Sequence, residues 1–124
     1  MAFTVVACSG ISSTGKLTAQ TGTVLLHRCG GEIEACVGAR AAALEDAVRH
    51  ADHILVLDGC EDCCGMKKVR ALGVEPDLHV VATACGIAKR GMDDPQYAEI
   101  ECLAAAVRAA IGRHSARFLP HCRL

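Results

Sequence analysis

Nearly continuous runs of hydrophobic residues mark three short segments of the chain, residues 3–7, 53–58 and 79–84. Continuous apolar runs of this length are typical of parallel strands that are buried on both faces of a sheet. A further segment, residues 32–37, alternates charged with apolar positions, which indicates a strand near the edge of the sheet. The pattern therefore predicts a sheet of four strands.

Between these runs, apolar residues recur at helical spacing. In one stretch Leu44, Val48 and Ala51 form a stripe along one face of an amphipathic helix. Gly73 is placed to end another helix, and Pro95 suits the first turn of the last one. The predicted helices cover residues 16–28, 39–51, 64–72 and 95–111.

Strands that alternate with helices imply right-handed crossovers and a parallel sheet covered on both faces. We therefore expect the α/β class, as a three-layer α/β/α arrangement with a mainly parallel sheet of four or slightly more strands in the order 2-1-3-4. A length of 124 residues fits one core, so residues 1–124 are expected to form a single domain.

Composition narrows the classes of function. The net charge is −1 and only 2% of residues are aromatic, which argues against a nucleic-acid surface or base-stacking platforms. No apolar run reaches the roughly 18 residues of a membrane span. We therefore expect no nucleic-acid or membrane partner, while the alanine-rich last helix is compatible with a homodimer.

The chain contains nine cysteines, an odd number that argues against complete internal pairing. Its start, MAFTVVACSG, lacks a basic segment and a long apolar run, so we expect no signal peptide and a cytoplasmic protein. Thiols stay reduced in that compartment. The cysteines therefore point to metal or thiol chemistry.

Four cysteines lie at the ends of the predicted strands: Cys36 ends the second strand, and the other three follow the first, third and fourth strands. The residues that follow parallel strands meet at one edge of the sheet, the carboxyl rim, where open α/β folds bind ligands. With the order 2-1-3-4, the cysteines of the first three strands converge, and the cysteine of the fourth lies one strand further out. In chain order these residues are Cys8, Cys36, Cys60 and Cys85.

The segment LDGCEDCCGMKK places Cys63 and Cys64 beside Cys60, in one turn that enters a helix. Backbone N–H groups and the positive helix end there favour the thiolate form. Four thiolates are the number that a tetrahedral zinc site needs. The predicted zinc ligands are Cys8, Cys36, Cys60 and Cys64, with Cys63 as the alternate to Cys64 and Cys85 as a more distant candidate.

Residues beside the thiols suit a supporting role. Glycines let the backbone approach the sulfurs, a serine turns the chain, an aspartate caps the turn or holds the loop, and a lysine offsets negative charge. A site of cysteines alone is soft, so an iron–sulfur cluster is the alternative to Zn²⁺. The supporting residues are Ser9, Gly10, Asp58, Gly59 and Lys67.

The remaining candidate ligands converge less well. His53 and His79 begin strands, which places them at the opposite rim, and the other histidines are expected to be solvated or structural. Cys29, Cys102 and Cys122 show no convergence with the other thiols.

Two other functions compete with zinc binding. Cys60 and Cys63 form a C-x-x-C pattern after a strand, so a thiol redox enzyme using Cys60, Cys63 and Cys64 is the main alternative. Residues 10–16, GISSTGK, approximate a phosphate-binding loop, but Leu17 stands where that loop needs Ser or Thr. A nucleotide-binding protein is therefore the weaker alternative.

These motifs together resemble the DGC-domain family. The resemblance rests on CSG at residues 8–10, DGC at 58–60, Cys64 with the lysines after it, and the segments ADHILVLDG and DLHVVATACGIAK. The family is thought to bind zinc through four cysteines, which implies Cys8, Cys36, Cys60 and Cys64 as ligands. The resemblance implies a small cytosolic zinc-binding protein and specifies neither a small-molecule substrate nor a reaction.

Overall fold

The computed structural model describes residues 2–118, with side chains as far as Ser115. Strands and helices alternate along the chain, as the hydrophobic pattern predicts. In chain order the elements are β1 (Phe3–Ala7), α1 (Ser13–Arg28), β2 (Ile33–Gly38), α2 (Leu44–His50), β3 (His53–Asp58), α3 (Cys64–Ala71), β4 (Leu78–Val81), a 3₁₀ turn (Thr83–Cys85) and α4 (Tyr97–Phe118).

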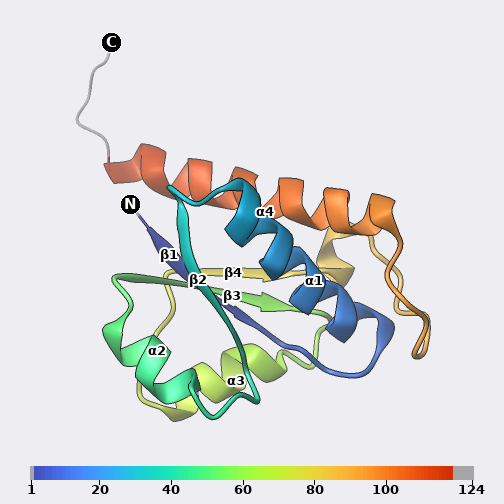
Figure 1. Cartoon of the computed structure of the whole chain (residues 1–124), viewed down its shortest axis with the longest axis horizontal. Coiled ribbons are helices and arrows are strands. Elements are labelled where there is room, and N and C mark those ends of the chain that lie inside the picture. The colour runs from blue at the N-terminus through green and yellow to red at the C-terminus, as the bar shows by residue number, and fades with distance from the viewer. Residues whose placement is uncertain (1, 119–124) are drawn as a thin grey trace.

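The four strands form one sheet in the order β2-β1-β3-β4, and every neighbouring pair is parallel. The predicted α/β class and strand order are therefore confirmed. Helices α1 and α4 lie on one face of the sheet, and α2 and α3 lie on the other (Figure 1). Because every strand runs in the same direction, all the loops that leave the strands meet at the carboxyl rim.

The core consists of two apolar layers, one on each face of the sheet. Val5 packs in the layer beneath α1 and α4, and its neighbour Val6 packs in the layer beneath α2 and α3. Leu57 and Val56 divide in the same way along β3. Successive side chains of a strand point to opposite faces, so a strand covered by helices on both faces needs apolar residues at every position.

Several element boundaries differ from the sequence expectations. α2 begins at Leu44 rather than at residue 39, because turns join Ala41 N–H to the Gly38 carbonyl and Leu44 N–H to the Ala41 carbonyl. β4 ends at Val81, and the 3₁₀ turn follows it. Cys85 therefore lies in that turn and does not directly follow the strand.

A β-bulge in β2 changes which face its side chains meet. Phe3 pairs with Ile33, whereas the next residue of β1, Thr4, pairs with Ala35. One extra residue in a strand reverses the alternation of its side chains. Cys36 consequently pairs with Val5 and packs in the layer beneath α1, two residues before β2 ends at Gly38. The expectation that Cys36 ends its strand is therefore wrong.

No helix among residues 2–118 is long and apolar enough to cross a membrane.

Candidate functional site

The CSG segment leaves β1 in a fixed turn. Cys8 N–H donates to the Leu57 carbonyl (3.0 Å), which continues the pairing of β1 with β3 by one residue. Ser9 adopts the left-handed region (φ 57°). Its N–H donates to Thr18 Oγ1 (3.1 Å) and its hydroxyl donates to the Ala7 carbonyl (3.2 Å). Cys8 is thereby held at the carboxyl rim, next to the first turns of α1.

The DGC segment is organised by the carboxylate of Asp58. This residue is fully buried, and its two oxygens accept hydrogen bonds from Gly65 N–H (2.7 Å) and Met66 N–H (3.2 Å) in the first turn of α3. The first N–H groups of a helix have no partner within the helix, and a negative charge there is favourable. Asp58 therefore caps α3 from the end of β3, which is one of the two roles expected for it.

Gly59 brings the same loop against α1. A Cβ atom at this position would lie 2.8 Å from the Thr14 carbonyl carbon, a separation that real Cβ atoms do not show. Only glycine lets the loop after β3 approach the first turn of α1 so closely. The central residue of the DGC segment is thus required by packing between two loops of the rim.

His79 extends the Asp58 network from β4. Its Nε2 lies 2.7 Å from Asp58 Oδ2, and its side chain is 25% exposed. The sequence reasoning placed His79 at the opposite rim, and that placement is wrong. β4 is offset along the sheet, so its second residue pairs with Val56 and lies only two residues short of Asp58.

Cys63 completes a group of three potential metal ligands. One ligand atom each of Asp58, Cys63 and His79 lies within 4.8 Å of the other two (carboxylate oxygen, Sγ and ring nitrogen, respectively). Zinc accepts sulfur, nitrogen and oxygen ligands, with ligand atoms about 3.3–3.8 Å apart around a tetrahedral ion. The arrangement can therefore hold a metal after small side-chain movements.

The electrostatics of Cys63 differ from the sequence expectation. Burial and the nearby Asp58 carboxylate raise the pKa of the Cys63 thiol, and the opposing effect of Lys67 is smaller. The predicted stabilisation of a thiolate at the helix start is therefore wrong for this residue. The charge of Asp58 outweighs that of the lysine, whereas a bound cation would favour the thiolate.

Backbone strain is concentrated at the same rim. Among residues 2–118, the residues other than glycine with positive φ are Ser9 (57°) and Cys63 (52°). Such conformations cost on the order of 1 kcal/mol and persist where the surrounding structure imposes them, often at functional sites. The strained residues lie next to Cys8 in one loop and beside Cys64 in the other.

Cys8 and Cys64 line a common cavity of about 410 Å³ between the CSG loop and α3. Two cationic residues, Arg40 and Lys68, also line it, together with Ala39. Two thiolates bound to one metal carry negative charge, which positive side chains beside them offset. Cys8 of the CSG loop and Cys64 at the start of α3 therefore line the same cavity.

The other predicted ligands are placed differently. The sulfur of Cys60 lies 3.7 Å from Asp62 Oδ2 and 3.9 Å from Lys89 Nζ. The sulfur of Cys36 packs against Gly22 of α1, and burial raises the pKa of this thiol. Cys85 packs against the core layer beneath α4, and burial, with a smaller effect of Cys102, raises its pKa.

The four predicted thiols are thus only partly brought together. All eight cysteines with described positions are free thiols. Within that part of the chain, two groups have three or more histidine, cysteine or acidic ligand atoms within 4.8 Å of one another. One is Asp58, Cys63 and His79, and the other is His53, Asp77 and His114. No three of Cys8, Cys36, Cys60 and Cys64 form such a group among the described residues.

In the loop that resembles a phosphate-binding motif, several hydrogen-bond donors already have acceptors within the protein. Ser12 Oγ accepts from Gly15 N–H (3.1 Å), and Ser13 N–H donates to the Gly91 carbonyl (2.8 Å). Lys16 Nζ donates to the Met92 carbonyl (2.7 Å) and forms an ion pair with Asp94 (3.2 Å). These donors are the ones that a phosphate group would need. The arrangement therefore argues against the nucleotide alternative.

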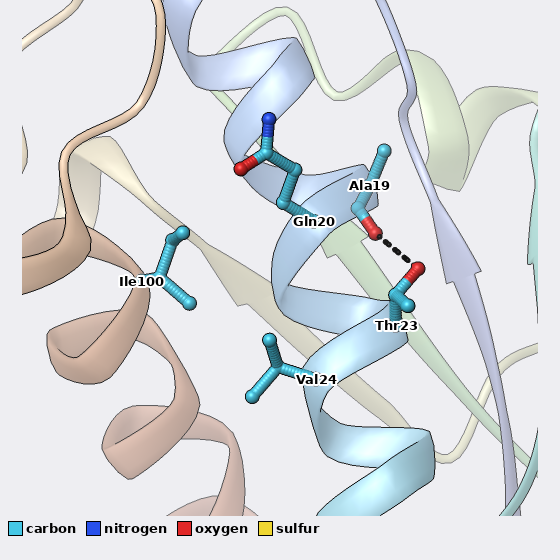
Figure 2. Close-up of a pocket in the computed structure, with 5 residues that line it drawn as sticks. All are labelled: Ala19, Gln20, Thr23, Val24 and Ile100. Atoms are coloured by element: carbon cyan, nitrogen blue, oxygen red, sulfur yellow. Dashed lines mark hydrogen bonds between the residues drawn. The ribbon is translucent and has the colours of Figure 1, made fainter.

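An apolar depression of about 370 Å³ lies between α1 and α4. Figure 2 shows Ile100 of α4 facing Gln20 and Val24 of α1, with Ala19 and Thr23 beside them. Thr23 Oγ1 donates to the Ala19 carbonyl within α1 (3.1 Å). None of the lining residues is a thiol or an ionisable group, so this depression is unsuited to metal chemistry.

His79 is the rim residue that sequence reasoning missed. The signal lay in DLHVV, where a polar residue interrupts an apolar strand next to the DGC segment in the sheet. A buried carboxylate generally needs several hydrogen-bond donors, and a histidine on the neighbouring strand is one available donor. The register of β4, which the sequence did not reveal, decides that this histidine reaches Asp58.

The comparisons with known proteins agree with the motifs of the rim. A protein-family model described as the DGC domain matches residues 4–107, a range that contains all the strands except the first residue of β1. Comparison with curated proteins and comparison with solved structures gave no match. Because the family model covers most of the chain, this protein belongs to the DGC-domain family.

Proposed function

We propose that this protein is a cytosolic zinc-binding protein whose metal is held by cysteine thiolates at the carboxyl rim of the sheet. The observation that carries the proposal is the cavity shared by Cys8 of the CSG loop and Cys64 of α3, with Arg40 and Lys68 beside them. Thiolates are ligands that zinc prefers, and the two cations offset their charge.

Two of the proposed ligands, Cys8 and Cys64, line this cavity, and the remaining ligands lie outside its lining. Cys60 and Cys63 lie on the loop that leads to Cys64, and Cys63 N–H donates to the Cys60 carbonyl (3.1 Å) in a tight turn. We propose that one of these two thiols supplies the third thiolate. The fourth ligand of the family expectation, Cys36, lies on the opposite face of the sheet, against Gly22.

Cys63 and His79 offer an alternative to Cys36. They belong to the group whose ligand atoms already lie within 4.8 Å of one another. Because His79 Nε2 faces Asp58, its Nδ1 is the nitrogen left for a metal, and Asp58 then orients the ring. A carboxylate that holds a metal-ligating histidine in this way is a common feature of zinc sites.

Metal analysis of the full chain, purified without a histidine tag from zinc-replete cells, tests the proposal. We expect about one tightly held zinc per chain, as a single thiolate site requires. Serine substitutions of Cys8, Cys60 and Cys64 should each lower the zinc content sharply, because serine does not replace a thiolate at zinc. Cys102→Ser is the matched control, because Cys102 is an exposed thiol of α4 that does not line this cavity.

Three further variants decide the fourth ligand. Loss of zinc in Cys36→Ser with retention in Cys63→Ser and His79→Gln supports the family set. Retention of zinc in Cys36→Ser with loss in Cys63→Ser and His79→Gln instead supports Cys63 and His79 as ligands.

Cobalt substitution provides a readout specific to thiolates. Cobalt bound by sulfur shows an intense near-ultraviolet charge-transfer band that nitrogen and oxygen ligands do not produce. Wild-type protein that takes up cobalt without this band would contradict the proposal. Visible absorption of the protein as purified, with iron and sulfide in the metal analysis, would instead identify an iron–sulfur cluster.

A further inference from the structure

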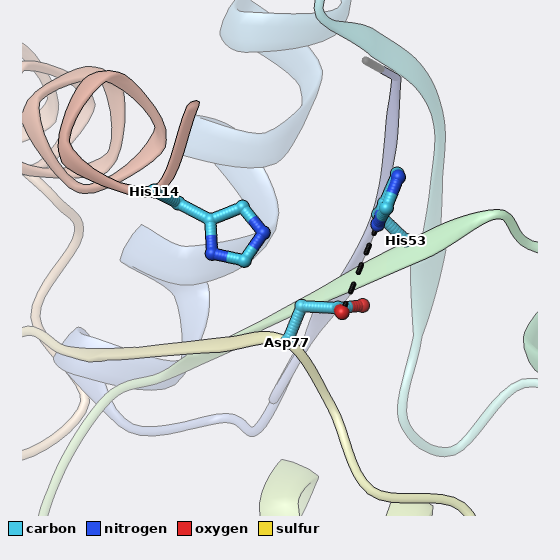
Figure 3. A group of neighbouring side chains, drawn as sticks. All are labelled: His53, Asp77 and His114. Atoms are coloured by element: carbon cyan, nitrogen blue, oxygen red, sulfur yellow. Dashed lines mark ion pairs between the residues drawn. The ribbon is translucent and has the colours of Figure 1, made fainter. Parts of the chain in front are cut away.

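The amino rim of the sheet, where the strands begin, carries a second group of potential ligands. It consists of His53 at the first position of β3, Asp77 immediately before β4, and His114 near the end of α4. One ligand atom of each lies within 4.8 Å of the other two. Figure 3 shows the His114 ring directed from α4 toward the pair formed by His53 and Asp77.

Asp77 is fixed by the backbone of β3. Its Oδ2 accepts from Ile54 N–H (2.8 Å), and its own N–H donates to the Ile54 carbonyl (2.9 Å). The other carboxylate oxygen, Oδ1, lies 3.7 Å from His53 Nδ1. The carboxylate is therefore held in one orientation, with Oδ1 directed at the histidine.

Nδ1 of His53 is enclosed and makes no hydrogen bond. Leaving a buried polar atom without a partner costs about 1–3 kcal/mol, so such an atom in a native fold needs an explanation. The separation of 3.7 Å from Asp77 Oδ1 is too long for a hydrogen bond. It is close to the edge of about 3.4 Å that separates two ligands of a tetrahedral zinc ion.

His114 is held in place by the helix that carries it. Val107, Ala110 and Ile111 are buried on α4, and His114 continues this stripe at helical spacing, with 9% of the residue exposed. Its ring contacts Phe3 (centroids 5.6 Å apart) and lies 6.2 Å from the His53 ring. Packing of α4 against the sheet thus positions His114 as the third ligand, and no cysteine is part of this group.

We propose that His53, Asp77 and His114 form a site for a divalent transition-metal ion, separate from the thiolates of the carboxyl rim. Two imidazoles and one carboxylate are ligands that zinc and ferrous iron accept, with a position left for water or a small ligand. The side chains of His53 and Asp77 are 32% and 35% exposed, so the ion can enter from solvent. The ion would provide the enclosed Nδ1 of His53 with a partner.

Imidazole NMR of the full chain during a zinc titration tests this site. We expect the ring resonances of His53 and His114 to shift together, with one apparent affinity, as zinc is added beyond the amount bound by thiols. His50 is the control, because it forms a comparable but exposed pair with Asp46 (3.3 Å) and has no third ligand. His53→Gln and His114→Gln assign the resonances.

Asp77→Asn separates a metal ligand from a residue that only supports the fold. The amide oxygen of asparagine can still accept from Ile54 N–H, while the carboxylate charge is lost. We expect the zinc affinity of this site to fall at least about tenfold with the unfolding midpoint little changed.

The proposal is overturned if His53 and His114 do not respond to zinc, if they respond no more strongly than His50, or if Asp77→Asn binds zinc as the wild type does. The thiolate band of the cobalt protein reports the carboxyl rim alone. A failure at one rim is therefore distinguishable from a failure at the other.

Discussion

The two rims of the sheet use an aspartate in contrasting ways. At the carboxyl rim Asp58 is fully buried and bound by two helix N–H groups and by His79. At the amino rim the Asp77 side chain is 35% exposed and is bound through one oxygen to Ile54. Asp58 joins β3, α3 and β4, whereas Asp77 leaves an oxygen directed at a histidine.

This difference separates two ways of building a polar cluster. The carboxyl rim is built largely by loops that follow the strands directly, so its residues occur as short motifs in the sequence. The amino rim gathers residues 53, 77 and 114, which come together only through the packing of α4 and the register of β4. Local motifs can reveal the first kind of cluster, and only a three-dimensional structure reveals the second.

The largest effect that we expect separates the two aspartates by stability. In the presence of a chelator, Asp58→Ala should lower the free energy of unfolding by about 3–4 kcal/mol, because two buried N–H groups and His79 lose their acceptor. Asp77→Ala should cost about 1 kcal/mol, because one partly exposed hydrogen bond is lost. Urea denaturation of both variants measures the difference.

Asp62→Ala is a control for loss of an acidic residue from the loop before α3, since Asp62 is exposed. Its effect should stay within about 0.5 kcal/mol. Equal costs for Asp58→Ala and Asp77→Ala would show that the two carboxylates contribute alike to the fold.

A smaller effect should distinguish glycines at the two rims. Gly59→Ala places a Cβ against Thr14 and should destabilise the protein by about 1–3 kcal/mol. Gly31, in the turn before β2, has no atom within 4 Å of the position that a Cβ would take and no positive φ. Gly31→Ala should therefore stabilise by up to about 1 kcal/mol, through the unfolded state. Thermal and urea unfolding should both show a loss of stability in Gly59→Ala and a gain in Gly31→Ala. A change of the same sign in the two variants would contradict the packing assigned to Gly59.

The smallest effect concerns acid stability. Glu99 Oε1 accepts from Gln96 N–H (2.8 Å) and from Arg90 (2.7 Å), and these bonds lower the pKa of Glu99. A carboxyl group with a lowered folded-state pKa contributes stability above its unfolded pKa of about 4.3, and this stability is lost as pH falls through the lower value. Wild type should therefore lose more stability than Glu99→Gln between about pH 6 and about pH 3.

Glu75 provides the comparison at the amino rim. A hydrogen bond from Arg70 lowers the pKa of Glu75 in the loop before β4, but this ion pair is exposed. Solvent screens exposed pairs, so Glu75→Gln should change the acid response less than Glu99→Gln. If the acid unfolding curves of Glu75→Gln and Glu99→Gln coincide, the two carboxylates contribute equally to acid stability and the prediction is wrong.

The sequence predicted the architecture because nearly continuous apolar runs such as those of β1 and β3 are typical of strands covered on both faces, whereas β4 is only partly buried. It also indicated capping of the turn as one of two roles for Asp58, the other being to hold the loop, because aspartate is a preferred capping residue before a helix. The limits of β4 and α2 were less accurate, since tertiary hydrogen bonds, such as Asp77 N–H to the Ile54 carbonyl, determine where a strand begins.

The arrangement of ligands was harder to predict for a specific reason. The face that Cys36 occupies depends on a bulge beside Glu34, and the reach of His79 depends on an offset of two residues in β4. Neither feature changes the hydrophobic pattern. His53 and His114 each fit a structural role when considered alone, and their proximity follows only from how α4 crosses the sheet.

The left-handed backbone of Ser9 and Cys63 has a consequence for engineering. A stability-guided redesign would place glycine at both positions, since glycine adopts this conformation without the cost of about 1 kcal/mol that other residues incur. At Cys63 the same substitution would delete a thiol beside Asp58 and His79. If Cys63 binds metal as proposed, thermostability and metal affinity would then be selected in opposite directions at a single codon, so a screen for one property alone would erode the other.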